Sequence, residues 1–216
     1  MDAEDATVTD PLRDDPRVRE YFGAAYERVR EFADFLEAEG DKRGLIGPRE
    51  LPRLWERHIL NSAALVPFLK DGGVVDVGSG AGLPGLVIAA MEPERDVVLV
   101  EPMDRRTQWL EEAAQRVGLQ HVTVVRDRAE GVHHVIAPNV TARAVAATDK
   151  LVKWTEHLVA DGGQMVFLKG RSARAEIEKA SPVLRRKRLA AEVIEAPTVE
   201  GLEPTTVVRI VSSAGV

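Results

Sequence analysis

A glycine-rich turn between a buried strand and a helix is the feature that most restricts how this chain can fold. Residues 74–85 read VVDVGSGAGLPG, so a β-branched run is followed by three alternating glycines and then by a helical run from Leu83. Glycine allows positive φ and close approach of a ligand, because it carries no Cβ. A helix that begins after such a turn directs free N–H groups and the positive end of its dipole toward it. The pattern predicts a β-turn-α unit with a ligand at the turn; a tight turn without a ligand is the alternative.

Short β-branched runs alternate with helical runs along the rest of the chain. This alternation is typical of a mostly parallel sheet that is covered by helices on both faces. We therefore predict an α/β fold of the doubly wound, Rossmann-like kind, with seven strands and an N-terminal helical extension. The predicted strands span 74–77, 96–101, 121–125, 140–145, 164–169, 190–195 and 206–211, and the predicted helices include 83–91, 103–117 and a basic helix after residue 170.

The first 70 residues differ in character from the rest. Residues 1–15 are acidic and small, which predicts a disordered tail. Apolar residues at spacings of three and four predict an amphipathic helix over 16–39, and a second helix is expected over about 53–69. We divide the chain into a disordered acidic tail (1–15), an N-terminal helical segment (16–70) and a ligand-binding domain (71–216).

The composition restricts the possible functions. The 216 residues include no cysteine, which excludes disulfides, thiolate metal sites and cysteine nucleophiles. The N-terminus lacks the apolar core of a signal peptide, and no run of about 18 apolar residues could span a membrane, so we expect a cytoplasmic protein. The net charge is −6, but residues 171–188 carry seven basic and two acidic side chains, a local charge of +5 that permits nucleic-acid binding.

The spacing of the glycines indicates which ligand the turn would hold. A dinucleotide fingerprint, G-x-G-x-x-G, would place glycine where this chain has Leu83, and the Gly-Lys-Ser/Thr of a phosphate-binding loop is missing. Gly78, Gly80 and Gly82 instead form G-x-G-x-G. S-adenosylmethionine, a zwitterionic nucleoside without phosphate, suits this loop better than a dinucleotide does.

Two acidic positions support a nucleoside ligand. Glu101 ends the second predicted strand, 23 residues after Gly78, where a carboxylate can accept hydrogen bonds from ribose hydroxyls in either cofactor class. Ala129 and Glu130 follow the third predicted strand, in the loop that flanks the adenine ring in such folds. A surface loop with a solvated acid is the alternative for this pair.

Several motifs together resemble one family, the 16S ribosomal RNA guanine-N7 methyltransferases, also called glucose-inhibited division protein B. The resemblance covers about residues 50 to 180. DVGSG by itself marks only a superfamily, whereas the combination is far more specific. The motifs are RHILNS (57–62), VVDVGSGAGLPGL (74–86), LVEPMDRR (99–106), VVRDRAE (124–130), TARAV (141–145) and FLKGRSARAE (167–176).

The resemblance implies a class I methyltransferase domain over 71–216 that binds S-adenosylmethionine and acts on 16S ribosomal RNA or the small ribosomal subunit. It implies that Gly78, Leu83, Ala129, Glu130 and Arg143 contact the cofactor. One segment departs from the family: HHVIAPNV (133–140) stands where relatives usually have an aromatic-Asp-Val-Val strand. The register of the fourth strand is therefore less certain than that of the others.

The implied RNA contacts come from two regions. Lys169 and Arg171 lie in the family's basic LKG motif, and with Arg174 they are expected to hold phosphates, which positions RNA without reading its sequence. Arg57 and His58 precede the first strand and could face the substrate. A core or capping histidine is the alternative at this place, and a solvated helix face is the alternative for the bases Arg185 to Arg188.

The implied reaction needs few catalytic groups. Guanine N7 carries a lone pair and no proton, so we name no general base and expect alignment of nitrogen, methyl carbon and sulfur to be the main task. Arg143 is a candidate clamp for the cofactor carboxylate, because a guanidinium forks onto carboxylate. We expect no metal site, since His133 and His134 are adjacent and point to different sides of a strand.

Other functions stay open at this stage. A small-molecule methyltransferase would need an apolar lid and would leave the basic segment without a role. A nicotinamide-dependent oxidoreductase is disfavoured by Leu83. A non-catalytic RNA-binding or cofactor-sensing protein would bind RNA without transferring a methyl group to it. We expect a monomer.

Overall fold

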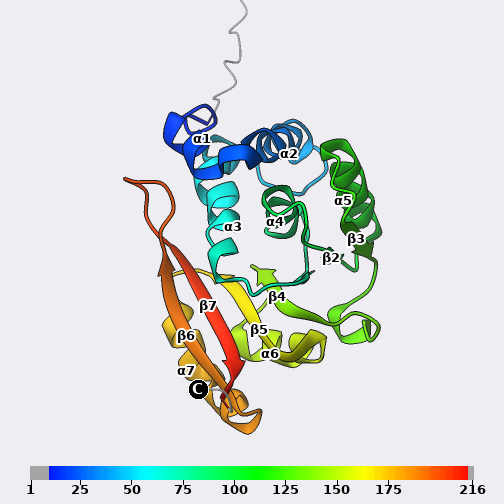
Figure 1. Ribbon diagram of the computed structural model, residues 1–216, viewed down its shortest axis with the longest axis vertical. Coiled ribbons are helices and arrows are strands. Elements are labelled where there is room, and N and C mark those ends of the chain that lie inside the picture. Colours follow the sequence, from blue (N-terminus) through cyan, green and yellow to red (C-terminus); the bar gives the residue numbers. More distant parts are fainter. Residues whose placement is uncertain (1–9, 214–216) are drawn as a thin grey trace, which may run out of the picture.

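Seven strands form one sheet in the computed structural model, which describes residues 10–213 (Figure 1). The strand order is β3-β2-β1-β4-β5-β7-β6. Strands β1 to β5 are parallel, and β7 runs antiparallel between β5 and β6. The α/β fold with a mostly parallel, seven-stranded sheet is therefore confirmed. The strands are β1 (Val74–Val77), β2 (Val97–Val100), β3 (Val122–Val125), β4 (Ala137–Arg143), β5 (Val159–Lys169), β6 (Leu189–Ala196) and β7 (Thr205–Ser212).

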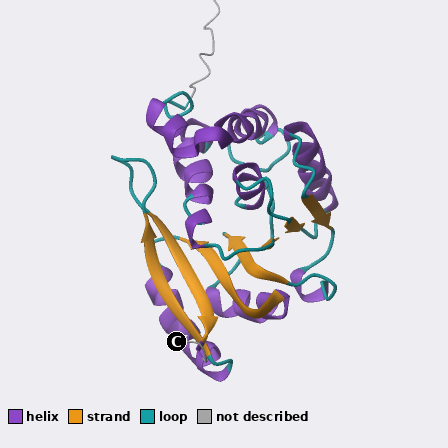
Figure 2. Cartoon of the chain, viewed as in Figure 1, coloured by secondary structure: helices purple, strands orange, loops and turns teal. Residues whose placement is uncertain are grey.

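Helices cover both faces of the sheet, as Figure 2 shows, because successive side chains of a strand point to opposite faces. Val74 of β1 belongs to one buried apolar cluster, and its neighbour Val75 belongs to the other. The first cluster also contains side chains of α1 (Pro16–Phe22), α2 (Tyr26–Glu39), α3 (Asn61–Ala63), α4 (Gly85–Met91) and α5 (Asp104–Val117). The second contains side chains of α6 (Thr148–Thr155) and α7 (Ala173–Arg186).

The N-terminal helices pack directly on the helices that flank β2. The rings of Phe35 in α2 and Trp109 in α5 stack with centroids 4.6 Å apart, and Arg28 donates a hydrogen bond to the carbonyl of Ala90 at 2.9 Å. The N-terminal helical extension is thus part of the same apolar cluster as α4 and α5. The boundary that we placed at residue 70 falls in the loop between a 3₁₀ turn (Val66–Phe68) and β1.

The first described residues differ from the expectation of disorder. The predicted tail, 1–15, falls on residues 1–9, which lie outside the described part of the chain, and on residues 10–15, which are ordered. The carboxylate of Asp10 is buried, and it accepts hydrogen bonds from the backbone N–H groups of Leu12 (2.9 Å) and Trp55 (2.8 Å). Acidic composition misled the prediction, because a carboxylate that caps backbone N–H groups can be ordered.

The segment that we predicted as one helix over 53–69 is divided. It contains 3₁₀ turns at Leu51–Arg53 and Val66–Phe68, a π-helical stretch at Trp55–Leu60, and the short α3. Pro52 and Pro67 lie in the 3₁₀ turns, where proline supplies no N–H to a helix. The π-helical stretch carries Arg57 and His58, and π-helical turns often occur at functional sites.

Strand β4 is shifted relative to its prediction over 140–145. It begins at Ala137 and ends at Arg143, with an irregular register between Ala137 and Asn139. Inside the departing segment, the buried amide of Asn139 exchanges hydrogen bonds with the backbone of Lys70, at 2.8 and 2.9 Å. This long-range pairing holds the start of the strand. At the other end the strand stops before Ala144, which has a φ of +54°, so Ala144 and Val145 lie beyond its end.

The single helix predicted over 16–39 is also divided, into α1 and α2, by a 3₁₀ turn at Gly23–Ala25, where Gly23 has a φ of +51°. The remaining boundaries differ by less. Helix α4 begins at Gly85 rather than at Leu83, and β5 begins at Val159 rather than at Gln164. In residues 10–213, no helix has the length and apolar character needed to cross a membrane.

Candidate active site

Three adjoining cavities follow the carboxyl ends of the parallel strands, where ligands bind in open α/β sheets. The first, about 180 Å³, lies beside Ala129 and Glu130; the central one, about 430 Å³, lies against the glycine loop; the large one, about 760 Å³, lies beyond β4 and β5. Gly78 lines the first and central cavities, Arg143 lines the central and large ones, and Val145 lines all three. The three cavities are therefore adjacent and share walls along this edge of the sheet.

The glycine loop needs glycine for its conformation. Gly78, Gly80 and Gly82 have φ of +69°, +54° and +95°. A Cβ on Gly78 would lie 2.7 Å from Cγ2 of Val145, and a Cβ on Gly82 would lie 2.4 Å from Cδ1 of Leu86. A side chain at Gly78 would therefore collide with a residue of the cleft wall, whereas a side chain at Gly82 would collide with the buried Leu86, and Gly82 lines none of these three cavities.

Glu101 braces this loop. Its carboxylate is 2% exposed, and it accepts hydrogen bonds from the N–H groups of Gly80 and Met103, both at 3.0 Å. We expected Glu101 to face a ribose, and the structure adds this bracing role. A carboxylate has about four lone-pair sites, so it can accept further hydrogen bonds from the central cavity that it lines.

Asp76 is a buried carboxylate beneath the loop that our sequence reasoning missed. It accepts hydrogen bonds from the N–H of Gly85 and the hydroxyl of Thr141, both at 3.1 Å. Burial raises the pKa of Asp76 to about 6, although these hydrogen bonds oppose the rise. The signal was available, because an acid stands in the middle of the apolar run VVDV, where every residue of β1 is buried.

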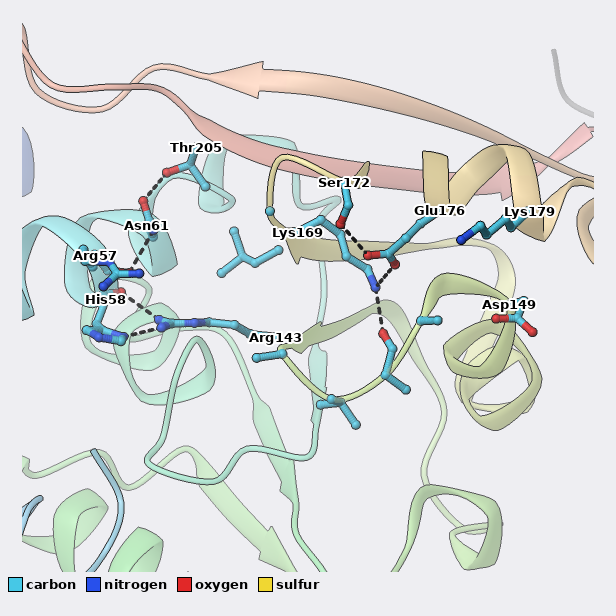
Figure 3. A pocket seen from close by; sticks show the side chains of 16 residues that line it. Arg57, His58, Asn61, Arg143, Asp149, Lys169, Ser172, Glu176, Lys179 and Thr205 are labelled. Atoms are coloured by element: carbon cyan, nitrogen blue, oxygen red, sulfur yellow. Dashed lines mark hydrogen bonds and ion pairs between the residues drawn. The ribbon is translucent and has the colours of Figure 1, made fainter. Parts of the chain in front are cut away.

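Arg143 and His58 line both the central and the large cavity. Figure 3 shows them in the wall of the large one. Arg143 reaches from the end of β4, and its guanidinium donates hydrogen bonds to Nδ1 and to the carbonyl of His58. Nε2 of His58 lies 3.0 Å from a carboxylate oxygen of Glu50. Burial lowers the pKa of Arg143 to about 10. Burial and the charge of Arg143 lower the pKa of His58 to about 4, against the opposing effect of Glu50.

The turn after Arg143 is strained. Ala144 has a φ of +54°, which is uncommon for a residue other than glycine. Such backbone clusters at functional sites when the surroundings hold it in place. It leaves Val145, which is 36% exposed, at the meeting point of the three cavities.

Lys169 is not presented as a free cation. Its ammonium donates a hydrogen bond to the carbonyl of Ala146 and pairs with Glu176, both at 2.8 Å, and its side chain is 8% exposed. Glu176 also accepts hydrogen bonds from Thr148 and Ser172. Figure 3 shows this cluster on the side of the large cavity opposite His58. The expected phosphate contact at Lys169 would require this pairing to change.

The other expected RNA residues differ in exposure. Arg171, just before α7, and Arg174, within it, are exposed and line a separate cavity together with Glu195 and Glu203, and Arg171 lies 3.8 Å from Glu203. Arg57 lines the large cavity and pairs with Glu50 at 2.8 Å. Lys179, which we did not single out as a site residue, is exposed and lines the same cavity.

Ala129 and Glu130 lie in a 3₁₀ turn (Ala129–Gly131) at the edge of the first cavity. The ring of His157 holds this turn from below, with Nε2 at 3.1 Å from the carbonyl of Ala129 and at 3.0 Å from that of Val132. Sequence reasoning missed His157, because its contact is with backbone and follows no motif.

The donor set of the cleft fits S-adenosylmethionine. The glycine loop accepts a close ligand, Glu101 offers a carboxylate, and the hydrogen-bond partners of Arg143 within residues 10–213 include no carboxylate. A buried guanidinium with neutral partners suits the carboxylate of an incoming ligand. No cluster of three or more potential metal ligands occurs among the residues that the structure describes.

Comparison with solved structures defines the class. An S-adenosylmethionine-dependent O-methyltransferase from Thermotoga maritima superimposes with a TM-score of 0.56 at 18% identity, over 84% of this chain and 71% of that one. The fold, with the glycine loop at the end of β1, is that of the Rossmann-like class I methyltransferases.

Comparison with sequences defines the family. The family described as rRNA small subunit methyltransferase G matches residues 25–200. Ribosomal RNA small subunit methyltransferase G of Clavibacter sepedonicus is 47% identical over 90% of this chain and 93% of its own length. The protein of that name from Bifidobacterium longum is 43% identical over 94% and 99%. The chain belongs to this family, and it is an S-adenosylmethionine-dependent methyltransferase.

Proposed function

We propose that this protein transfers a methyl group from S-adenosylmethionine to N7 of a guanine in 16S ribosomal RNA, in the cytoplasm. The observation that carries the proposal is the adjacency of the cavities, which share wall residues at the end of β4. The glycine-loop cavity and the large cavity share His58, Arg143, Ala144 and Val145 in their walls, and the exposed Lys179 of α7 lines the large cavity. A nucleoside cofactor and a base of an RNA can therefore meet at the end of β4.

The cofactor is assigned to the first and central cavities. Its adenine would lie beside Ala129 and Glu130, its ribose at Glu101, and its methionine carboxylate near Arg143. Leu83, which lies two residues before α4, would also contact the cofactor. The remaining residues of this assignment are the three glycines of the loop, Gly78, Gly80 and Gly82.

Alignment is the main task of the protein in this reaction. The bound cofactor supplies an electrophilic methyl group, and guanine N7 attacks with its own lone pair, so no proton has to be removed first. His58 has a pKa of about 4 and its Nδ1 already accepts from Arg143, so a role as general base is unsupported. Holding the two reactants in line can by itself supply a large part of the acceleration.

RNA is assigned to the large cavity and to the exposed start of α7. Arg171, Arg174 and Arg57 are accessible to phosphates, and each such contact would position the RNA backbone. Lys169 and His58, which we also predicted as RNA contacts, would act by shaping the walls of the cavity. A small-molecule substrate would leave the exposed bases of α7 without a role.

The proposal is tested by deleting the gene in the cell and by assaying methyl transfer with the purified protein. Deleting the gene should remove one N7-methylguanine from 16S ribosomal RNA, and the purified protein should transfer labelled methyl groups to small-subunit particles from the deletion strain. An unchanged modification map, together with no incorporation into RNA or particles, would overturn the proposal. Incorporation at another base atom would preserve the class and reject N7.

A further inference from the structure

We propose that Glu50 and His58 act as a positioning relay that holds the Arg143 guanidinium toward the carboxylate of the cofactor. This inference rests on the proposed function, because it takes the role of Arg143 as cofactor clamp from it. Nothing in the motifs of the chain points to Glu50, which lies 93 residues from Arg143 in the sequence.

The geometry defines how the relay would work. The guanidinium of Arg143 can donate only, so Nδ1 of His58 must be the acceptor of their hydrogen bond. The proton of the neutral ring then lies on Nε2, which donates to the carboxylate of Glu50 at 3.0 Å. Each nitrogen of His58 thus has one role, and the carboxylate fixes the orientation of the ring.

The charges explain why a histidine separates the acid from the arginine. A direct pair between Glu50 and Arg143 would satisfy the guanidinium and compete with a carboxylate from the ligand. With neutral His58 between them, Arg143 is oriented but its charge has no adjacent carboxylate partner in the described residues. Within residues 10–213, the charges of Glu50, Arg57 and Arg143 act on His58, and Arg57 is paired with the other oxygen of Glu50.

The location ties the relay to ligand binding. His58 and Arg143 line both the central and the large cavity. The side chain of His58 is 12% exposed and that of Glu50 is 32% exposed, so the relay lies in the wall of the cleft. It also joins the N-terminal segment to the end of β4, which brings the N-terminal helices into cofactor recognition.

The test compares two nucleosides that differ in the amino acid portion. S-adenosylhomocysteine carries the carboxylate, and 5′-methylthioadenosine lacks it. In the wild-type protein, calorimetry should give a tighter Kd for the first. In His58→Leu, we expect the Kd of S-adenosylhomocysteine to rise about tenfold or more, while that of 5′-methylthioadenosine stays within about twofold. His58→Asn, whose amide oxygen can replace Nδ1 as acceptor, should recover most of the lost affinity.

Two glutamates provide a matched comparison. Glu50→Gln keeps an acceptor for Nε2 but removes the charge, and we expect a selective loss of about threefold for S-adenosylhomocysteine. Glu56→Gln removes a carboxylate of the same 32% exposure that pairs with Arg53 instead, and it should leave both Kd values unchanged. Equal weakening of both nucleosides by His58→Leu would mean a structural role only and would reject the relay.

The tautomer of His58 can be measured without any assay of enzyme activity. In ¹⁵N-labelled protein, the ring of His58 should show the tautomer protonated at Nε2 at neutral pH. A ring protonated at Nδ1, or no preference of the wild type for S-adenosylhomocysteine, would overturn the relay. The proposed function fails separately: a wild type that shows the nucleoside preference but methylates no RNA would leave the relay standing and remove the RNA substrate.

Discussion

At the scale of single residues, we expect small substitutions in the glycine loop and at Asp76 beneath it to change cofactor affinity and stability most clearly. Gly78 combines a φ of +69° with a site where a Cβ would lie 2.7 Å from Val145. Gly118, at the end of α5, has a φ of +74° but nothing within 4 Å of the added atom. The two glycines separate the cost of the backbone conformation from the cost of the collision.

We expect Gly78→Ala to lower the cofactor affinity by about tenfold or more, since Val145 must move into the cleft, and to cost about 1–2 kcal/mol of unfolding free energy for the left-handed backbone alone. Gly118→Ala should show only the loss of stability. Calorimetric titration and chemical denaturation measure both quantities. Adding Val145→Ala to Gly78→Ala should recover part of the affinity; no loss of affinity in Gly78→Ala would remove the loop from the site.

The raised pKa of Asp76 predicts how the stability of the protein depends on pH. Its pKa of about 6 lies above the ordinary 3.8, so between these values the folded protein binds more protons than the unfolded chain. The stability contributed by Asp76 therefore falls as the pH rises from about 4 to 6, and above that range its burial costs about 3 kcal/mol.

We expect Asp76→Asn to be more stable than the wild type at pH 7 and to lose this advantage as the pH falls to 4. The amide can still accept from the N–H of Gly85 and donate to the hydroxyl of Thr141, which can rotate. Denaturation of both proteins across this pH range gives the difference in unfolding free energy. His58, whose lowered pKa has the opposite effect on stability, is present in both proteins and cancels from this difference. A difference that does not change with pH would contradict a raised pKa at Asp76.

At the scale of elements, the Lys169–Glu176 pair joins the end of β5 to the start of α7 and, through Ala146 and Thr148, to α6. We expect Lys169→Met to cost about 2–3 kcal/mol of unfolding free energy. That is less than for a fully buried pair, because the Glu176 side chain is 24% exposed. Adding Glu176→Gln should recover part of this loss, because no unpaired charge then remains. Denaturation of the two single variants and the double variant measures the coupling.

The same variants decide whether Lys169 also contacts RNA. A structural Lys169 leaves the salt dependence of RNA binding unchanged in Lys169→Met. If that variant instead keeps its stability and lowers the salt slope, then the sequence-based expectation of a phosphate contact at Lys169 holds and the pairing is dispensable.

At the scale of the whole molecule, the net charge of −6 means that attraction to RNA must be local. The salt slope is the change of the logarithm of the RNA-binding constant with the logarithm of salt concentration. We expect Arg174→Ala and Lys179→Ala each to lower its magnitude by about one, because each variant loses one phosphate contact and then releases fewer counterions on binding. Lys42→Ala, which removes a 70% exposed cation after α2, is the control and should leave the slope unchanged. Binding to 16S RNA measured across a salt series gives the slopes. Equal effects of all three variants would place the RNA elsewhere than on α7.

The strand and helix pattern and the glycine loop could be predicted from the sequence, because local periodicity and backbone requirements depend on neighbouring residues. Leu83 and Arg143 as candidate cofactor contacts came instead from the resemblance to the family. The divided segment after Pro52 and the bounds of β4 could not, since proline turns and the amide of Asn139 act through contacts with distant backbone. Composition alone also misjudged the ordered, buried Asp10.

The tertiary structure alone decided which charges are free and which are partnered. The sequence presents Lys169 and Arg171 as equivalent phosphate contacts, yet the fold pairs Lys169 with Glu176 and leaves Arg171 in solvent. It also places Arg143 against a histidine 85 residues away. Local sequence determines backbone shape through sterics and hydrophobic periodicity. The electrostatic role of a side chain depends on partners and burial that exist only when distant segments meet.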